Sequence, residues 1–202
     1  MRYHPPFDLI ADLLFVAALA RAGDLRGAYP GVPFVSILGR TPLIVWFSRV
    51  TRACYHDALG EVQCESGYTE VTVMAPLRRR RVFVPVIYAS DERSVQIGQF
   101  WYHMPKLLAA VDVRIEGGRV RGRLGDESGD VSARLLGAVC RGVRRPRWTW
   151  PIHFPGGAWT RALIVATGEM RLARVESGSL PQGRLLTYGL YVGGVRMQLP
   201  RP

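Results

Sequence analysis

Lys106 is the only lysine in the chain, and it lies within the apolar and aromatic stretch 101–111. Of the 27 lysine and arginine side chains, all the others are arginine. An amine among apolar neighbours loses solvation, and desolvation favours its neutral form. A neutral amine is a nucleophile towards carbonyl carbon. The residue type and its surroundings therefore predict a Schiff-base lysine.

The same stretch also allows a structural interpretation of Lys106. A GC-rich genome favours arginine over lysine, so a single lysine can remain by chance. Long basic side chains also lie with their stems on apolar surface while the charged end reaches water. The residues of this stretch alone leave both interpretations open.

The cysteines and histidines do not show the spacing of a metal site. Cys54, Cys64 and Cys140 are odd in number, and the four histidines are scattered along the chain. We therefore expect reduced thiols in a cytoplasmic protein, with no metal and no other cofactor. Asp8 and Asp12 interrupt the apolar N-terminus, which argues against a signal peptide. No apolar run has the length that spans a bilayer, so we expect no membrane partner.

The formal net charge of +11 is compatible with nucleic acid, anionic lipid or anionic small molecules as partners. Two basic segments, 78–81 and 144–150, could form a nucleic-acid surface, and the second one interleaves tryptophans with arginines. Four consecutive arginines between two strands are more typical of a solvated hairpin turn. We therefore rank a nucleic-acid-binding module last and expect no nucleic-acid partner.

Strand patterns dominate the chain. The expected strands cover residues 43–50, 68–75, 82–88, 111–115, 120–124, 131–139, 163–166, 169–175, 185–192 and 195–199. Gly193-Gly194 predicts a hairpin between the last two, and residues 141–161 read as a basic, Trp- and Pro-rich connection. Short turns between most strands predict an α+β protein that is mainly antiparallel β, with a few peripheral helices.

The longest predicted helix covers residues 8–22. Its apolar residues recur on one helical face, Pro5 and Pro6 precede it, and Gly23 can end it. We predict a single domain over residues 1–202, with 1–26 as an N-terminal helical extension. Such an apolar helix is a candidate contact in a homo-oligomer.

A second, short helix is expected from residue 91 to about residue 96. Ser90 is a good N-cap, and acidic residues follow in the first turn, where the helix dipole favours anions. Gly98 is expected to end this helix. Pro105 biases the residue before it away from the helical region, so Lys106 should follow a fixed turn.

Three segments around Lys106 form one pattern. The first runs from Val86-Ile87-Tyr88 through Ser90-Asp91-Glu92 and Gly98 to Met104-Pro105-Lys106-Leu107. The second is Gly67-Tyr68-Thr69-Glu70, and the third is Gly39-Arg40-Thr41-Pro42-Leu43-Ile44-Val45. This pattern resembles the acetoacetate decarboxylase family, with its Pro-Lys pair, its Tyr-x-Glu strand start and its arginine before an apolar strand. The resemblance covers most of residues 30–199.

The resemblance implies an acetoacetate decarboxylase-like β-barrel or sheet and an iminium on Lys106. It further implies that Glu70 acts as acid or base in the proton transfers and that Arg40 binds a substrate carboxylate. Four more residues are expected to line the substrate pocket: Tyr68, Tyr88, His103 and Met104.

The chain departs from the family pattern beside the lysine. The decarboxylases usually carry a second lysine after the catalytic one, and here that position is Leu107. Burial alone would then have to lower the pKa of Lys106. A pocket formed by the large side chains of residues 101, 102 and 104 would suit a substrate larger than acetoacetate.

These observations predict a lyase that decarboxylates, or otherwise transforms, a β-keto acid or related carbonyl compound through an iminium on Lys106. The alternative is a non-catalytic member of the same fold that binds a small molecule and uses Lys106 as a charged anchor.

Overall fold

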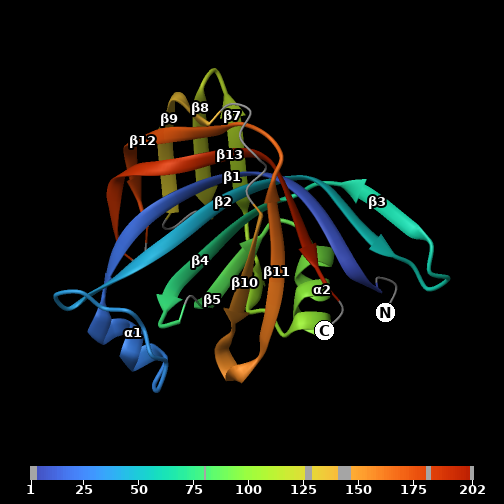
Figure 1. Cartoon of the computed structure of the whole chain (residues 1–202), viewed down its shortest axis with the longest axis horizontal. Helices are drawn as coiled ribbons and strands as arrows, with labels where there is room; N and C mark the ends of the chain where they lie inside the picture. The colour runs from blue at the N-terminus through green and yellow to red at the C-terminus, as the bar shows by residue number, and fades with distance from the viewer. Residues whose placement is uncertain (1–3, 80, 126–128, 141–146, 181–182, 201–202) are drawn as a thin grey trace.

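The computed structural model describes residues 4–79, 81–125, 129–140, 147–180 and 183–200. These residues form one sheet system of thirteen strands, two α-helices and a short 3₁₀ turn at Pro155–Gly157 (Figure 1). The strands are β1 (His4–Arg21), β2 (Arg40–His56), β3 (Val62–Ser66), β4 (Thr69–Leu77), β5 (Arg81–Ala89), β6 (Lys106–Leu108), β7 (Val111–Glu116), β8 (Arg119–Leu124), β9 (Gly129–Cys140), β10 (Arg147–His153), β11 (Trp159–Ala166), β12 (Met170–Ser179) and β13 (Arg184–Leu199). The helices are α1 (Ala22–Ala28) and α2 (Glu92–Tyr102).

Seven strands close into a ring. Their order is β1-β2-β4-β5-β10-β11-β13, and β13 pairs again with β1. Among the described residues, the β5–β10 and β5–β6 pairs are parallel and all other strand pairs are antiparallel, so the predicted α+β, mainly antiparallel architecture is confirmed. The ring surrounds an apolar barrel core that includes Leu13, Trp46, Met74, Ile164 and Val192, and α2 adds Tyr102 to it.

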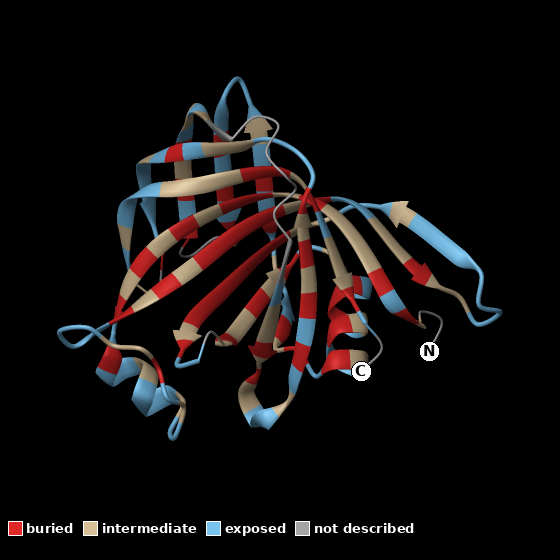
Figure 2. Cartoon of the chain, viewed as in Figure 1, coloured by how far each residue is buried: buried red, intermediate tan, exposed pale blue. Residues whose placement is uncertain are grey.

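The sheet continues from β13 through β12, β9 and β8 to β7 and folds back over the ring. A second apolar cluster, the sandwich core, lies between this extension and the outer face of β1, β2 and β4. Its members include Leu14, Phe47, Val73, Val120 and Ala133. Figure 2 shows the result: buried residues line the central strands, whereas the β3 hairpin is mostly exposed.

The prediction of a helix over residues 8–22 is wrong, because this segment is the long strand β1. β1 lies between β2 and β13 and is covered on both faces, by the barrel core on one side and the sandwich core on the other. A strand that is buried on both faces has no polar alternation, so its sequence cannot be distinguished from a helix by periodicity. Of the predicted helical extension over residues 1–26, the described part is β1 followed by the first residues of α1. A homo-oligomer therefore stays a prediction without that contact.

The predicted hairpin at Gly193-Gly194 is also wrong, because β13 runs unbroken from residue 184 to 199. The two glycines form a bulge in the β1–β13 pairing, and Gly194 has a φ of 59°. Asp12 accepts a hydrogen bond from the Gly194 nitrogen at 3.0 Å and pairs with Arg49 at 2.7 Å. A diglycine serves a bulge as well as a turn, since both need left-handed backbone.

The remaining predicted strands are confirmed. Most are longer than predicted, and β4 and β12 begin one residue later than predicted. The β7–β8 hairpin turns at Gly117-Gly118, and β4 and β5 pair antiparallel across the arginine run. The basic connection predicted over 141–161 is partly wrong, because residues 147–153 form β10. Residues 80 and 141–146 lie outside the described part of the chain.

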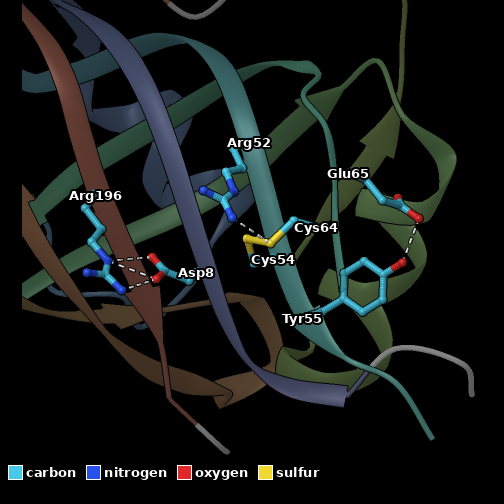
Figure 3. The surroundings of a disulfide bond; sticks show 7 residues. All are labelled: Asp8, Arg52, Cys54, Tyr55, Cys64, Glu65 and Arg196. Carbon is cyan, nitrogen blue, oxygen red and sulfur yellow. Dashed lines mark hydrogen bonds and ion pairs between the residues drawn. A yellow bond between two sulfur atoms is a disulfide. The ribbon is translucent and has the colours of Figure 1, made fainter. Parts of the chain in front are cut away.

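The expectation of reduced thiols is wrong for Cys54 and Cys64, which form a disulfide (Figure 3). The two residues lie directly opposite each other in the antiparallel β2–β3 pair, with their Cα atoms 4.2 Å apart. No pattern in residues 54–64 predicted the β2–β3 hairpin that brings them together. A cytoplasmic location, argued from free thiols, loses that support. Among the described residues, no helix is long and apolar enough to span a bilayer.

Candidate active site

Lys106 is positioned by backbone hydrogen bonds where β6 joins the ring. β6 pairs parallel with β5, with Lys106 opposite Ile87, and the Ile87 nitrogen donates to the Pro105 carbonyl at 3.0 Å. The Gln99 amide of α2 donates to the Lys106 carbonyl at 2.7 Å. The chain on both sides of the lysine is therefore anchored, and only the side chain can move.

The Lys106 amine lies at the centre of a buried polar cluster. Its Nζ donates to Glu70 Oε2 at 2.7 Å and to Ser94 Oγ at 2.8 Å. Tyr68 lies beside it, with the ring centroid 5.6 Å from Nζ. The Lys106 side chain is 8% exposed and that of Glu70 11%. Strands β4 and β6 and helix α2 thus bring together three residues that are far apart in the sequence.

The pKa of Lys106 is raised, contrary to the expectation that burial alone would set it. Burial lowers the pKa of the ammonium, but the negative charge of Glu70, a smaller contribution from Tyr68 and the hydrogen bonds that the ammonium donates to both outweigh it. Burial likewise raises the pKa of the Tyr68 hydroxyl, so that group stays a donor at neutral pH. The resting site therefore holds an ammonium–carboxylate pair rather than a free amine.

Helix α2 is longer than predicted and begins one residue later. Asp91 rather than Ser90 is the N-cap, and its side chain accepts from the Ser94 nitrogen at 2.8 Å. Gly98 does not end the helix but lies inside it, against the stem of Lys106. A Cβ at Gly98 would lie 2.6 Å from Lys106 Cδ. The glycine thus leaves the space that the lysine stem occupies.

A cavity of about 50 Å³ lies next to the amine. This is room for a few water-sized groups. Buried Tyr102 and Met104 help to line it, whereas Trp101 packs against the His4 ring at 5.4 Å. This cavity is smaller than the expected substrate larger than acetoacetate would need.

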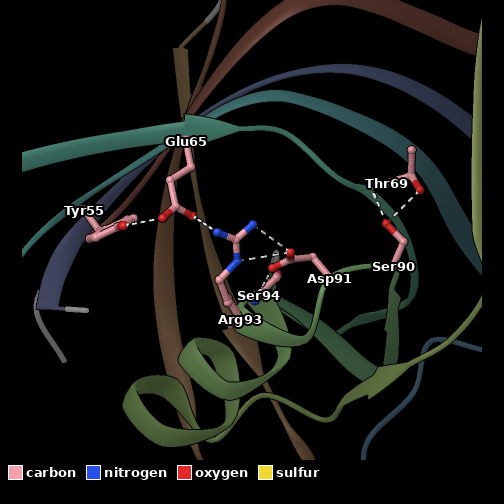
Figure 4. A network of polar contacts seen from close by, with 7 residues as sticks. All are labelled: Tyr55, Glu65, Thr69, Ser90, Asp91, Arg93 and Ser94. Carbon is pink, nitrogen blue, oxygen red and sulfur yellow. Dashed lines mark hydrogen bonds and ion pairs between the residues drawn. The ribbon is translucent and has the colours of Figure 1, made fainter. Parts of the chain in front are cut away.

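A chain of charged side chains forms one wall of the cavity (Figure 4). Arg93 donates to Asp91 Oδ2 through Nε at 3.3 Å and Nη2 at 3.1 Å, and through Nη1 to Glu65 Oε2. Tyr55 donates to the other oxygen of Glu65 at 2.6 Å. Within the described residues, no group of three His, Cys, Asp or Glu side chains could hold a metal ion.

The structure brings four of the seven predicted site residues together. Lys106 and Glu70 are paired, Tyr68 lies beside them and Met104 lines the cavity. The other three, Arg40, Tyr88 and His103, lie elsewhere.

Arg40 is at the start of β2, eight residues from Ser48, the partner of Glu70 across the strands. At about 3.3 Å per residue this is a span of about 26 Å, too far for Arg40 to bind a carboxylate beside Lys106. Tyr88 packs against the sandwich core, on the opposite face of β5 from Ile87. His103 is an exposed left-handed C-cap of α2.

Sequence reasoning missed Ser94, Arg93 and Glu65. Ser94 and Gly98 are four residues apart, so two small residues share one face of α2. That spacing, read together with a nearby lysine, could have indicated where the amine packs. No signal indicated Glu65, because its contact with Arg93 depends on the unexpected β2–β3 hairpin.

Comparison with known proteins identifies the fold. No protein-family model matches the chain, and no curated protein is similar to it in sequence. Acetoacetate decarboxylase from Legionella pneumophila superposes with a TM-score of 0.61 at 12% identity, over 100% of this chain and 88% of that one. The chain has the acetoacetate decarboxylase fold. The fold expected from the Lys106 pattern is thus confirmed.

Two further structures with the acetoacetate decarboxylase fold are similar to this chain. The enduracididine biosynthesis enzyme MppR, complexed with pyruvate, gives a TM-score of 0.63 at 12% identity, over 100% of this chain and 90% of that one. An acetoacetate decarboxylase-like enzyme from Sphingomonas wittichii gives a TM-score of 0.58 at 14% identity, over 97% of this chain and 91% of that one. The structural neighbours are enzymes, and at these identities the likeness concerns the fold.

Proposed function

We propose that the chain is a Schiff-base enzyme that acts on a small carbonyl compound through an iminium on Lys106. The observation that carries this proposal is a buried amine with a carboxylate 2.7 Å from its nitrogen, beside a cavity of about 50 Å³. A lysine kept only for its ion pair with Glu70 would not need a cavity at its nitrogen.

Because the pKa of Lys106 is raised, the ammonium must lose a proton before the nitrogen can react with a carbonyl group. Glu70 takes one proton from the ammonium, which leaves a neutral amine. The nitrogen lone pair then bonds to the carbonyl carbon, while the C=O π electrons move to oxygen. A proton passes from nitrogen to that oxygen, and Glu70 returns its own proton to the hydroxyl, which leaves as water. The product is the iminium, and Glu70 is again a carboxylate.

With a β-keto acid, the next step would be loss of CO₂. The electron pair of the breaking C–C bond moves into the C=N⁺ group and gives an enamine, whose carbon then takes a proton. Water finally releases the ketone from the lysine. This makes the chain a carbon–carbon lyase. Among solved neighbours, acetoacetate decarboxylase performs such a reaction by its name, and MppR has been observed with the condensation product of pyruvate and imidazole 4-carboxaldehyde.

One observation favours a second candidate, a non-catalytic binding protein of the same fold. The resting ammonium is held by Glu70 and Ser94, so the site could serve as a charged anchor for a ligand. In that case, replacement of the amine by another cation would preserve ligand binding.

Reductive trapping distinguishes the two candidates. Borohydride added with acetoacetate or pyruvate should leave a stable adduct on Lys106, which peptide mass spectrometry locates without ambiguity because the chain has no other lysine. Lys106→Arg should remove the adduct from the peptide that contains residue 106. A folded wild-type protein that remains unmodified with every keto acid, but is stabilised by one of them equally well in Lys106→Arg, would contradict the enzyme and support the binding protein.

A further inference from the structure

Two cations, Arg93 and Lys106, and two carboxylates, Glu65 and Asp91, line the cavity. Glu70, the ion-pair partner of Lys106, lies next to this lining. With Glu70 included, the formal charge of the group is −1. A substrate carboxylate that entered without any rearrangement would therefore add a second net negative charge.

The two carboxylates on Arg93 are held very differently. Asp91 is the N-cap of α2: one oxygen accepts from the Ser94 nitrogen, and the other accepts twice from Arg93. Asp91 cannot leave without uncapping the helix. It therefore fixes the direction in which the Arg93 guanidinium points.

Glu65 contacts the remaining guanidinium nitrogen, Nη1, and comes from β3 rather than from α2 (Figure 4). It belongs to β3, a strand of five residues that pairs with β2 outside the main order of the sheet. The side chain of Glu65 is 32% exposed and can turn towards solvent. Its second oxygen is held by the buried Tyr55 hydroxyl. If Glu65 turns away, Nη1 of Arg93 and the hydroxyl of Tyr55 both face the cavity.

We propose that Glu65 occupies the place of a substrate carboxylate in the resting site, and that a small keto acid displaces it to bind Arg93 and Tyr55. This inference rests on the proposed function and names its substrate class. A guanidinium donates to a carboxylate with fixed geometry, so the exchange replaces one carboxylate with another without loss of bonds. With Glu65 turned out to water, the same wall can hold an acid next to Lys106 without excess negative charge. Arg93 is the residue that selects the acid over a neutral ketone.

The test compares pyruvate with its neutral methyl ester in the trapping reaction. Arg93→Gln should raise the pyruvate concentration for half-maximal trapping about tenfold or more, and Glu65→Gln should lower it several-fold. For the methyl ester, the concentration for half-maximal trapping should change less than twofold in both variants. Arg114→Gln and Glu176→Gln are matched controls, because they alter exposed ion pairs on β7 and β12.

Lactate separates this inference from the Schiff-base proposal, since it has a carboxylate but no ketone. Lactate should raise the melting temperature of wild type and more so of Glu65→Gln, but not of Arg93→Gln. This result would support the carboxylate site even if trapping failed. The carboxylate site would be overturned by either of two results. One is an equal change in the trapping of pyruvate and of its methyl ester in Arg93→Gln. The other is a rise in melting temperature with lactate that persists in Arg93→Gln.

Discussion

Glu70→Gln is expected to destabilise the protein by on the order of 3–5 kcal/mol at pH 7. The substitution leaves the Lys106 ammonium buried, with its 2.7 Å ion pair removed. It should also slow imine formation by about 10²-fold or more, because the group that takes and returns the proton is lost. Urea unfolding and the rate of reductive trapping measure the two effects. Glu70→Asp keeps the charge, so its stability and its trapping rate should lie between those of wild type and Glu70→Gln.

The pH dependence of this effect follows from the direction of the Lys106 pKa. Because Glu70 raises it, the stabilisation from the pair is complete below the ordinary lysine pKa of about 10.4 and disappears as pH rises through the folded-state value. In Glu70→Gln burial acts without the opposing charge of Glu70, so the pKa of the Lys106 amine falls. The stability difference between the two proteins should therefore be large at pH 7 and narrow above about pH 10.

The surface pair made by Glu176 provides the control for Glu70→Gln. Glu176 lies 3.7 Å from Arg119 on partly exposed strands, so Glu176→Gln should cost less than about 1 kcal/mol. Equal losses of unfolding free energy in Glu70→Gln and Glu176→Gln would show that the buried pair does not act as described. A loss in Glu70→Gln that does not depend on pH would show the same.

Gly98→Ala is expected to impair the site, although alanine is the better helix former. In an exposed helix interior the change would stabilise the protein by about 1 kcal/mol. Here the new Cβ would lie 2.6 Å from Lys106 Cδ, 3.1 Å from Cε and 3.2 Å from Cγ. The stem must shift, and Nζ then loses its alignment with Glu70 and Ser94. We expect a loss of about 1–3 kcal/mol and an approximately 10²-fold slower trapping reaction.

Gly27→Ala is the matched helical control. Gly27 lies in α1, and a Cβ there would meet nothing within 4 Å. This variant should be as stable as wild type or slightly more so, with unchanged trapping. If Gly98→Ala behaved in the same way as Gly27→Ala in both measurements, the space beside the lysine stem would have no role.

The sequence predicted those strands that have one buried face. In β7, buried Val111 and Val113 alternate with exposed Asp112 and Arg114, and the alternation alone locates the strand. β1 could not be predicted in this way, because neighbours such as Leu13 and Leu14 are both fully buried, against different cores. Alternation in the sequence reflects a difference in burial between the two faces of a strand, and both faces of β1 are buried.

The pair at the centre of the candidate site was predictable, but its electrostatics and most of the residues around it were not. The pattern around Lys106 and Glu70 suggested that they act together, but the direction of the lysine pKa depends on the 2.7 Å between them. Arg40 was assigned from its place in the sequence pattern, which carries no information about position along a 17-residue strand. Arg93 has no sequence signature, since its role depends on which carboxylates surround it.

The sharing of β1 and β2 by two cores has a thermodynamic consequence. Each strand supplies alternate side chains to the barrel core and to the sandwich core, so neither core can open without exposing a wall of the other. Local opening of the β7–β8 hairpin and of the barrel should therefore be linked in amide hydrogen exchange. A ligand bound at Lys106 would then slow exchange in strands of the sandwich that it never touches.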